Sequence, residues 1–496
     1  MKHDVHAWMF KTVIVLALAA ILLLAQEVTA QGSVGSLDVE GLHQLSNHSA
    51  AARAFGGVTI GAENEMGLMF VNPTALQSLD GAGVSLGGFH RYRDLRQEQQ
   101  FAPVRYYPNL SLLLEGLTDD IPDPDPSLIG FTPADSVQRP FDDIEPRWSR
   151  SKTSDFPLHA LLAIPISMGG LTVTAGIGAV QHADLNYYDQ NNNLLDPAVL
   201  SQRPLPTLRP TDDSPVTVDW YQSIRSREGS IRGYGAAIAG EVERYNLTIG
   251  ISGLLLKGKS DDFEQQVQRG RLVFYANEFR ADSSQGRLTM MGTSEFAGME
   301  FTFGGVLNGR FASVGMVVKP PTRYTRSYQI EIAGDTTGTS FTSDVNGEDH
   351  FQLPWRGSVG LLLKPHENLR IGLEYELRPY TSATFTSSAN VETSPWESSS
   401  LFRIGTEYEV SPWLMLRGGI RGEADVFIPE GSPITDEPVN YRIYSAGFGL
   451  NLYSVRWNLT YENAHVKYNE IWGSAISRNW DRRHVLVADI SFTIPI

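Results

Sequence analysis

The sequence Gly83-Val-Ser85-Leu-Gly87 matches the G-x-S-x-G pattern that surrounds the nucleophilic serine of many hydrolases. That motif works where a strand, a sharp turn and a helix follow one another. Residues 82–89 instead alternate like a single strand, and no histidine or acid stands in a recognisable place beside the serine. We therefore expect Ser85 to lie on one face of a strand. An enzyme such as a lipase is the weakest of the functions considered.

The histidines and acidic residues have no spacing that predicts a metal or cofactor site. None of the 11 histidines stands at the intervals typical of zinc ligands. The segment Thr118–Pro146 contains eight acidic residues and one basic residue, Arg139, so its oxygens could bind divalent cations. It lacks the spacing of an EF-hand, and a solvated loop stiffened by prolines explains it more simply. We expect no cofactor, no metal and no catalytic residue.

Charged side chains alternate with apolar ones from Leu369 to Arg378, where the sequence is LRIGLEYELR. Alternation with a period of two predicts a strand with one apolar and one polar face. The polar face carries Arg370, Glu374, Glu376 and Arg378. A basic side chain that faces lipid at the middle of a membrane costs about 2–4 kcal/mol. If this strand crosses a membrane, the four charges must therefore face a polar lumen, where opposite charges can pair.

The same alternation recurs along the chain. Clear examples are Leu171–Ala179, Leu247–Ser252 and Val455–Glu462. Short turns such as Arg244-Tyr-Asn246 and Tyr453-Ser454 join the predicted strands at one end. The other ends are joined by segments that we expect to be long polar loops: Thr118–Pro146, 184–229, Lys257–Glu295 and Thr322–His350. Short turns at one end and long loops at the other are typical of an outer-membrane barrel.

These features predict an all-β fold, a transmembrane antiparallel β-barrel of about 14 strands. A soluble β-sandwich or propeller would also alternate, but its strands would average about 5–6 residues. Several of the alternating segments are long enough to cross a bilayer when tilted. Only a closed barrel pairs every backbone group of such strands within lipid. A barrel of this width is not filled by its own side chains, so we expect the lumen to be wet or plugged.

The N-terminus predicts export. Lys2 and Lys11 precede the apolar run Thr12–Ala25, and the small residues of Val28-Thr-Ala30 fit a cleavage site. We therefore predict a signal peptide over residues 1–30. The run is shorter than the roughly 20 residues of a transmembrane helix, although an uncleaved anchor is the alternative. The chain has no cysteine, and its formal net charge of −16 argues against a nucleic-acid partner.

Residues 31–80 precede the first strong predicted strand and form a second predicted unit. They are rich in Gly and Ala, and Pro73 biases Asn72 toward an extended conformation. A compact segment ahead of a wide barrel suits a plug, so we predict a hatch over residues 31–80. Residues 81–496 would then form the transmembrane barrel with its long extracellular loops.

Residues 52–76, ARAFGGVTIGAENEMGLMFVNPTAL, resemble the N-terminal signature of the FadL/TodX-type outer-membrane transporters (the OMPP1 family). The resemblance rests on Phe55-Gly56-Gly57, Asn72-Pro73 and Leu76, while Thr74 stands where the family usually has Ala and Ala75 where it usually has Gly. Three later segments are also similar: Phe311–Tyr324, Leu401–Glu423 and Ile428–Leu452. The resemblance is weak from Thr118 to Gly229, and no ligand-contact position of the family can be matched.

The resemblance implies a 14-stranded barrel with an N-terminal hatch that takes up long-chain fatty acids or aromatic hydrocarbons passively. Its gating motif would comprise Gly56, Gly57, Asn72, Pro73 and Thr74. The PorV-like barrels share the same N-terminal pattern, so a component of protein secretion is the alternative function. The expected partners are outer-membrane lipid including lipopolysaccharide, a hydrophobic small molecule and the barrel-assembly machinery. The chain ends at Ile496 rather than at the terminal aromatic residue common in such barrels.

Overall fold

The structure is a computed structural model. It describes residues 42, 48–77, 79, 81–99, 147–168, 171–196, 211–275, 279–282, 286–336, 339–394, 396–425, 439–472 and 475–495. The predicted signal peptide, the first part of the predicted hatch and the acidic segment Thr118–Pro146 lie outside the described residues, apart from Leu42.

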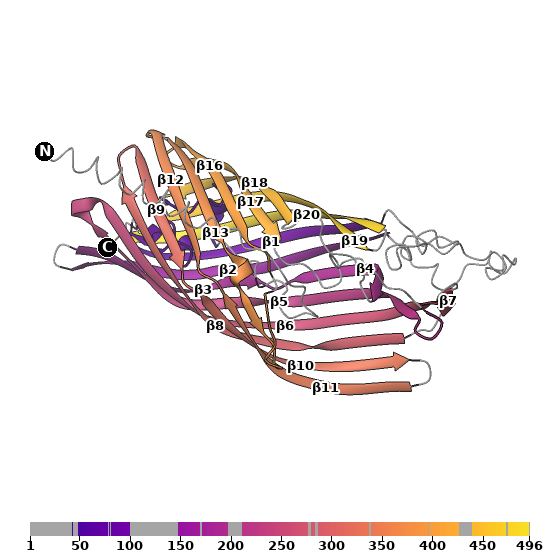
Figure 1. The fold of residues 1–496 in the computed structure, drawn as a ribbon. Helices are drawn as coiled ribbons and strands as arrows, with labels where there is room; N and C mark the ends of the chain where they lie inside the picture. The colour runs from indigo at the N-terminus through magenta and orange to yellow at the C-terminus, as the bar shows by residue number, and fades with distance from the viewer. Residues whose placement is uncertain are drawn as a thin grey trace.

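One antiparallel sheet closes on itself into a barrel (Figure 1). Its strands are β1 (Gly81–Gln99), β2 (Arg147–Met168), β3 (Leu171–Asp184), β4 (Tyr187–Asp196), β5 (Val216–Val242), β6 (Leu247–Phe274), β7 (Phe279–Asp282), β8 (Gly286–Asn308), β9 (Ala312–Lys319), β10 (Thr322–Thr336), β11 (Thr339–Leu353), β12 (Arg356–His366), β13 (Leu369–Arg378), β14 (Thr384–Thr386), β15 (Glu392–Thr393), β16 (Ser399–Ser411), β17 (Leu414–Asp425), β18 (Val439–Leu452), β19 (Val455–Trp472) and β20 (Ala475–Pro495). β1 pairs with β2 on one side and with β20 on the other. Some consecutive elements, such as β9 and β10, are two parts of one strand of the barrel. The prediction of a closed antiparallel barrel of about 14 strands is confirmed.

Successive side chains alternate between the interior and the outside of the barrel. In β6, Leu254 and Leu256 are 3% and 2% exposed, whereas Leu255 between them is 55% exposed. The same alternation places an apolar belt on the outside, with members such as Leu86, Leu162, Ile251, Phe303, Leu416 and Phe492. Exposed aromatic side chains stand at the short-turn end, where such residues mark a membrane interface: Tyr245, Phe311, Trp413 and Tyr453. The outside of the barrel is therefore suited to contact with lipid.

Two of the predicted loops are wrong. The segments Lys257–Glu295 and Thr322–His350 consist largely of strand, because β6, β8, β10 and β11 continue through them. Parts of 184–229 likewise belong to β4 and β5. β5 and β6 stay paired from their short turn out to Val216 and Phe274. Backbone pairing needs no apolar face once strands leave the membrane, so alternation of apolar residues did not reveal these extensions.

Prolines interrupt two neighbouring strands at the same height. One break lies at Pro320 and Pro321 between β9 and β10, and the other at Pro354 between β11 and β12. Proline has no N–H to donate to a ladder, which explains the interruptions. β9 pairs with β12 on one side of the breaks, and β10 pairs with β11 on the other. The wall changes course here. Lys319 is the last residue of β9 and Arg356 is the first residue of β12, so both lie at the breaks.

Residues 48–77, here called the N-terminal segment, lie inside the barrel, where Figure 1 shows them in indigo. α2 (Ala50–Ala54) is capped by the Ser49 hydroxyl and contacts β17 to β20. η1 (Met66–Leu68) contacts β2, and η2 (Pro73–Leu76) contacts β3, β5, β6 and β8. The described residues contain no helix long and apolar enough to cross a membrane. The segment touches separate parts of the wall; that it forms a hatch stays a prediction.

Candidate functional site

Asn72, Pro73 and Thr74 form the tight turn that begins η2. Asn72 Oδ1 accepts hydrogen bonds from the Thr74 backbone N–H (3.3 Å) and the Thr74 hydroxyl (2.7 Å). Asn72 Nδ2 donates to the Thr59 carbonyl (2.9 Å), which ties the turn to an earlier part of the segment. Proline suits the first position of a helical turn because its missing N–H is not needed there. Thr74 thus adds a side-chain hydrogen bond that an alanine could not make.

This turn packs directly against two glycines of the barrel wall. A Cβ added to Gly250 of β6 would lie 2.8 Å from the carbonyl carbon of Pro73. A Cβ added to Gly304 of β8 would lie 2.7 Å from Asn72 Oδ1. Only glycine permits so close an approach of the wall to the turn.

An apolar groove of about 500 Å³ lies at the same part of the wall. Gly250 and Gly304 border this groove, together with side chains of the outer apolar belt such as Ile249, Ile251 and Phe303. The glycine backbone is therefore the thin partition between the Asn72-Pro73-Thr74 turn and the lipid-facing side of the barrel.

Gly56 and Gly57 form the turn after α2, and both need to be glycine. Their φ angles are 69° and 79°, a left-handed conformation that other residues rarely adopt. A Cβ on Gly56 would collide with the carbonyl oxygen of Ile404 in β16. A Cβ on Gly57 would lie 3.0 Å from the Arg421 side chain of β17. The motif residues therefore fall into two separate contacts with the wall, one at β16–β17 and one at β6–β8.

Glu374 of β13 binds the N-terminal segment to the wall. Its Oε2 accepts hydrogen bonds from the backbone N–H groups of Thr59 (2.6 Å) and Ile60 (3.1 Å) and from the Thr59 hydroxyl (3.0 Å). Its Oε1 accepts from Arg403 Nη1 at 2.5 Å. Glu374 is 2% exposed, and a carboxylate buried to that degree requires such partners. One side chain thus holds both the segment and a neighbouring strand.

The other three charges predicted on this strand also have interior partners. Glu376 accepts a hydrogen bond from Arg378 Nε (2.7 Å) and another from Arg403. Arg370 lies nearer the short-turn end and is partly exposed, with Glu63 of the N-terminal segment 3.3 Å away. Two of the four charges therefore contact the segment, and two pair within the wall.

A further ionic contact anchors α2. Arg53 donates to Glu462 of β19, with Nε 3.0 Å from Oε1 and Nη2 2.5 Å from Oε2. Arg421 of β17 donates to the same carboxylate at 2.5 Å. The segment is therefore tied to β13 and β19 by carboxylates that also bind arginines of other strands, Arg403 of β16 and Arg421 of β17.

The carbonyl of Phe70 meets the wall at the proline interruption. It accepts from the Thr302 hydroxyl (3.1 Å) and from Lys319 Nζ (3.3 Å). Lys319 Nζ also bonds Glu300 Oε1 at 2.5 Å, and Arg356 Nη2 bonds Glu300 Oε2 at 2.5 Å. The two basic residues at the breaks therefore share one buried carboxylate, and one of them reaches the N-terminal segment.

A cavity of about 230 Å³ lies between the N-terminal segment and the charged wall. Among the described residues, eight basic and five acidic side chains border it, so this part of the lining is positive overall. Arg356 Nε and Nη1 and Arg403 Nε are buried, and these atoms have no hydrogen-bond partner in the part of the chain that the structure describes. Buried donors of this kind are expected to bind a polar group, so the cavity is suited to an anion.

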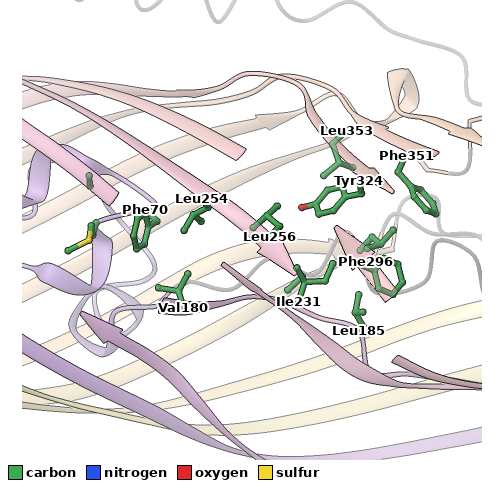
Figure 2. Close-up of a cluster of buried hydrophobic side chains, with 14 of the residues drawn as sticks. Phe70, Val180, Leu185, Ile231, Leu254, Leu256, Phe296, Tyr324, Phe351 and Leu353 are labelled. Carbon is green, nitrogen blue, oxygen red and sulfur yellow. The ribbon is translucent and has the colours of Figure 1, made fainter. Parts of the chain in front are cut away.

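Apolar side chains line the interior along a different part of the wall. Figure 2 shows them in a row that leads from the N-terminal segment toward the long-loop end. They are Phe70, Val180, Leu185, Ile231, Leu254, Leu256, Phe296, Tyr324, Leu353 and Phe351, here called the apolar stripe. Each is at most 3% exposed, so the stripe is packed rather than open. Aromatic contacts close its far end, with Phe351 and Phe385 ring centroids 4.9 Å apart.

Ser85 has a histidine partner that the sequence did not indicate. Ser85 Oγ lies 2.9 Å from His159 Nε2, because the β1–β2 ladder brings residues 74 positions apart together. His159 Nδ1 donates to the carbonyl of His48 (2.7 Å), so its Nε2 is the acceptor for the serine hydroxyl. Both ring nitrogens of His159 are thereby engaged, no carboxylate among the described residues bonds this histidine, and Ser85 is 2% exposed. The pair therefore binds the N-terminal segment and lacks the third member of a hydrolase triad.

No family model matches the chain, and no curated protein matches it. Solved structures do. A FadL homologue from Pseudomonas aeruginosa superposes with a TM-score of 0.58 at 13% identity, over 90% of this chain and 98% of the homologue. The toluene transporter TodX from P. putida gives 0.53 at 12% identity, over 92% and 100% of the two chains. The monoaromatic hydrocarbon channel CymD gives 0.51 at 11% identity, over 92% and 99%. The chain thus has the β-barrel fold of the FadL/TodX-type outer-membrane channels.

Proposed function

We propose that the protein is a passive outer-membrane transporter for hydrophobic small molecules. The apolar stripe is the observation that carries this proposal. It offers a continuous apolar surface from Phe351 near the long-loop end to Phe70 of the N-terminal segment. A hydrophobic solute gains nothing from a wet pore, whereas burial of apolar area along such a stripe is favourable. The structural neighbours named for toluene and monoaromatic hydrocarbons support the same class of ligand.

Entry and exit follow from the contacts of the segment. A ligand that displaces packed side chains of the stripe advances to Phe70, beside the obstruction formed by residues 48–77. Movement of the Asn72-Pro73-Thr74 turn away from Gly250 and Gly304 would uncover the inner side of this thin part of the wall, whose outer side borders the apolar groove. Exit to the groove would also need the β6–β8 ladder to open at this pair of glycines. The N-terminal segment acts as a hatch in this proposal. Its hydrogen bonds to Glu374 and the ion pair of Arg53 with Glu462 hold it closed.

The positive cavity favours a ligand with an anionic head group. Arg356 and Arg403 have buried donor atoms without partners among the described residues, and both border this cavity. Tyr324 and Leu353 of the apolar stripe stand beside the strand ends that carry Lys319 and Arg356. A fatty acid places a carboxylate and an alkyl chain on one molecule, which suits both surfaces. A toluene-like arene would use only the stripe.

This proposal includes no chemical reaction. Ser85 and His159 are buried and have no acidic partner among the described residues, and His159 bonds the His48 carbonyl of the N-terminal segment. Three or more metal-ligating side chains do not cluster anywhere within the described ranges.

The apolar stripe favours transport over the alternative of a PorV-like secretion component, because a barrel that acts only through its surface loops needs no apolar path in its lumen.

Uptake measurements test the proposal. Cells with and without the gene are supplied with radiolabelled oleate or with radiolabelled toluene, and initial rates of uptake are compared. We expect the gene to raise the uptake of at least one of the two compounds, with oleate favoured. Equal rates for both compounds in both strains would overturn the transport proposal and leave the secretion component as the better explanation.

A further inference from the structure

Two basic side chains stand on the outside of the barrel where the apolar belt ends. On β5 and β6 the exposed large apolar residues nearest the long-loop end are Tyr234 and Leu255, which are 44% and 55% exposed. The next outward positions are Arg232 and Lys257, both exposed. Arg232 and Lys257 are direct partners across the β5–β6 ladder. They therefore lie side by side at one height, just beyond the region in contact with acyl chains.

This pair is not neutralised by its surroundings. Adjacent strands lie about 4.8 Å apart, and like charges placed directly opposite each other destabilise a sheet. The flanking positions in the same row are Gln181 of β3 and Ala297 of β8, which are uncharged. No carboxylate within the described ranges forms an ion pair with Arg232 or Lys257. The sheet thus holds two cations together without an anion.

Lys259 extends the patch on β6 but is not equivalent to the pair. It faces Glu295 of β8 across the next row of the ladder. The negative charge of Glu295 offsets the positive charge of Lys259. The excess positive charge therefore lies in the row of Arg232 and Lys257, which is nearer the apolar belt.

We propose that Arg232 and Lys257 bind the phosphate of an outer-leaflet lipid, as a phosphorylated glycolipid of the lipid A type would present it. Such a lipid places its phosphate immediately above its acyl chains, as this wall places its cations immediately above Tyr234 and Leu255. Arginine and lysine near a membrane surface attract anionic head groups, and arginine matches the geometry of a phosphate. A free phosphate would reach the same cations without the contribution of the apolar belt. A lipid uses both surfaces, which favours the lipid over free phosphate as the occupant.

The test measures lipid binding to the full-length protein in detergent. Delipidated protein is titrated with diphosphoryl lipid A, and bound lipid is counted by native mass spectrometry. The double variant R232Q/K257Q should bind roughly tenfold more weakly than the wild type, because two surface cations are lost. The variant R232K/K257R, which keeps both charges, should retain most of the binding.

Two controls separate this site from general attraction. The variant R244Q/R310Q removes two exposed arginines from short turns at the opposite end of the barrel and should bind as the wild type does. Lipid A stripped of its phosphates should not distinguish the wild type from R232Q/K257Q. Unchanged binding of diphosphoryl lipid A by R232Q/K257Q overturns the proposal. An equal loss in R244Q/R310Q, or full competition by millimolar inorganic phosphate alone, overturns it as well. Gel mobility before and after heating verifies that each variant is folded.

Discussion

The carbonyl carbon of Pro73 lies so close to Gly250 that a Cβ on this glycine would be 2.8 Å away from it. Gly305 on β8 has nothing within 4 Å of the place where its Cβ would be. These two glycines therefore allow one chemical change to be compared at two sites. Gly250→Ala should push the Asn72-Pro73-Thr74 turn from the wall, at a cost of about 1–3 kcal/mol typical of overpacking. Gly305→Ala should leave the turn in place.

Hydrogen exchange of residues 70–77, followed by mass spectrometry, measures this displacement. We expect faster exchange in Gly250→Ala and unchanged exchange in Gly305→Ala. If the turn is the gate, Gly250→Ala should also raise the basal permeability of liposomes that contain the protein. Identical exchange in the two variants would show that the turn does not depend on its contact with Gly250.

Removal of Glu374 should release the N-terminal segment. Glu374→Ala deletes three hydrogen bonds to Thr59 and Ile60 and leaves the buried Arg403 without one of its carboxylates. Breaking a buried ion pair in this way costs about 3–5 kcal/mol. Arg370→Gln on the same strand removes a partly exposed contact with Glu63, which is worth at most about 1 kcal/mol. Limited proteolysis near residues 48–77 should therefore accelerate strongly in the first variant and little in the second.

The barrel could be predicted from the sequence because its periodicity is local. The alternation in Leu369–Arg378 and the tight turn at Tyr453-Ser454 each require only a few neighbouring residues, and together they determine strand direction and connectivity. The outward extensions of β5, β6, β10 and β11 were not predictable in this way. Their two faces are both polar or exposed beyond the membrane, so the hydrophobic pattern that indicates a strand is absent there.

The candidate site was less accessible to sequence reasoning, because it depends on register between distant strands. Leu254 and Leu256 face the interior, but Leu255 between them makes the run LLL, which does not show which leucines point inward. His159 reaches Ser85 only through the pairing of β1 with β2. The motif Asn72-Pro73-Thr74 was visible in the sequence, whereas the glycines that receive it lie on β6 and β8 and became apparent only in three dimensions.

The two faces of β6 provide a direct test of the apolar stripe. Leu256→Ala shortens an interior side chain of the stripe, and Leu255→Ala makes the same change on the outside of the same strand. Loss of the apolar contact should weaken the binding of a hydrophobic ligand by about 1 kcal/mol or more, which is at least roughly fivefold. Leu255→Ala should not change binding. Tryptophan or ligand fluorescence titration measures both, and equal effects of the two variants would contradict a path along the interior.

The protonation of His48 predicts a pH dependence of the segment. Its Nε2 donates to the Gln181 carbonyl at 2.8 Å, and burial, followed by the nearby charge of His159, lowers the pKa of His48 to about 3. The released segment would bind a proton near the ordinary value of 6.5, so docking loses stability as the pH falls below about 6.5. At pH 5 the loss from this group is about 2 kcal/mol. Glu65 acts in the opposite direction, because burial and then the Asp489 charge raise its pKa.

Comparison of two variants separates these opposing groups. In Glu65→Gln the acidic group no longer titrates, so exchange of the segment should accelerate between pH 7.5 and pH 5 once intrinsic rates are corrected. In Glu65→Gln/His48→Gln this acceleration should be much smaller. If both variants show the same pH dependence, His48 is not the group responsible.

Arg356 should determine the preference for a ligand with a carboxylate. Its Nη2 is engaged by Glu300, while Nε and Nη1 have no partner in the described chain and remain available to a ligand in the adjoining cavity. Arg356→Gln should weaken the binding of oleate roughly tenfold, since a hydrogen bond to a charged group contributes about 1.5–3 kcal/mol. Methyl oleate, which has no anionic head, should lose far less. The ratio of the two dissociation constants is the measurement, because a general loss of folding or of apolar contact affects acid and ester alike.

Arg483→Gln supplies the control: Arg483 borders the same cavity but donates to Asp481 and Tyr441, so its replacement should leave the ratio near that of the wild type. An unchanged ratio in Arg356→Gln would mean that this arginine stabilises the bend in the wall without contacting the ligand.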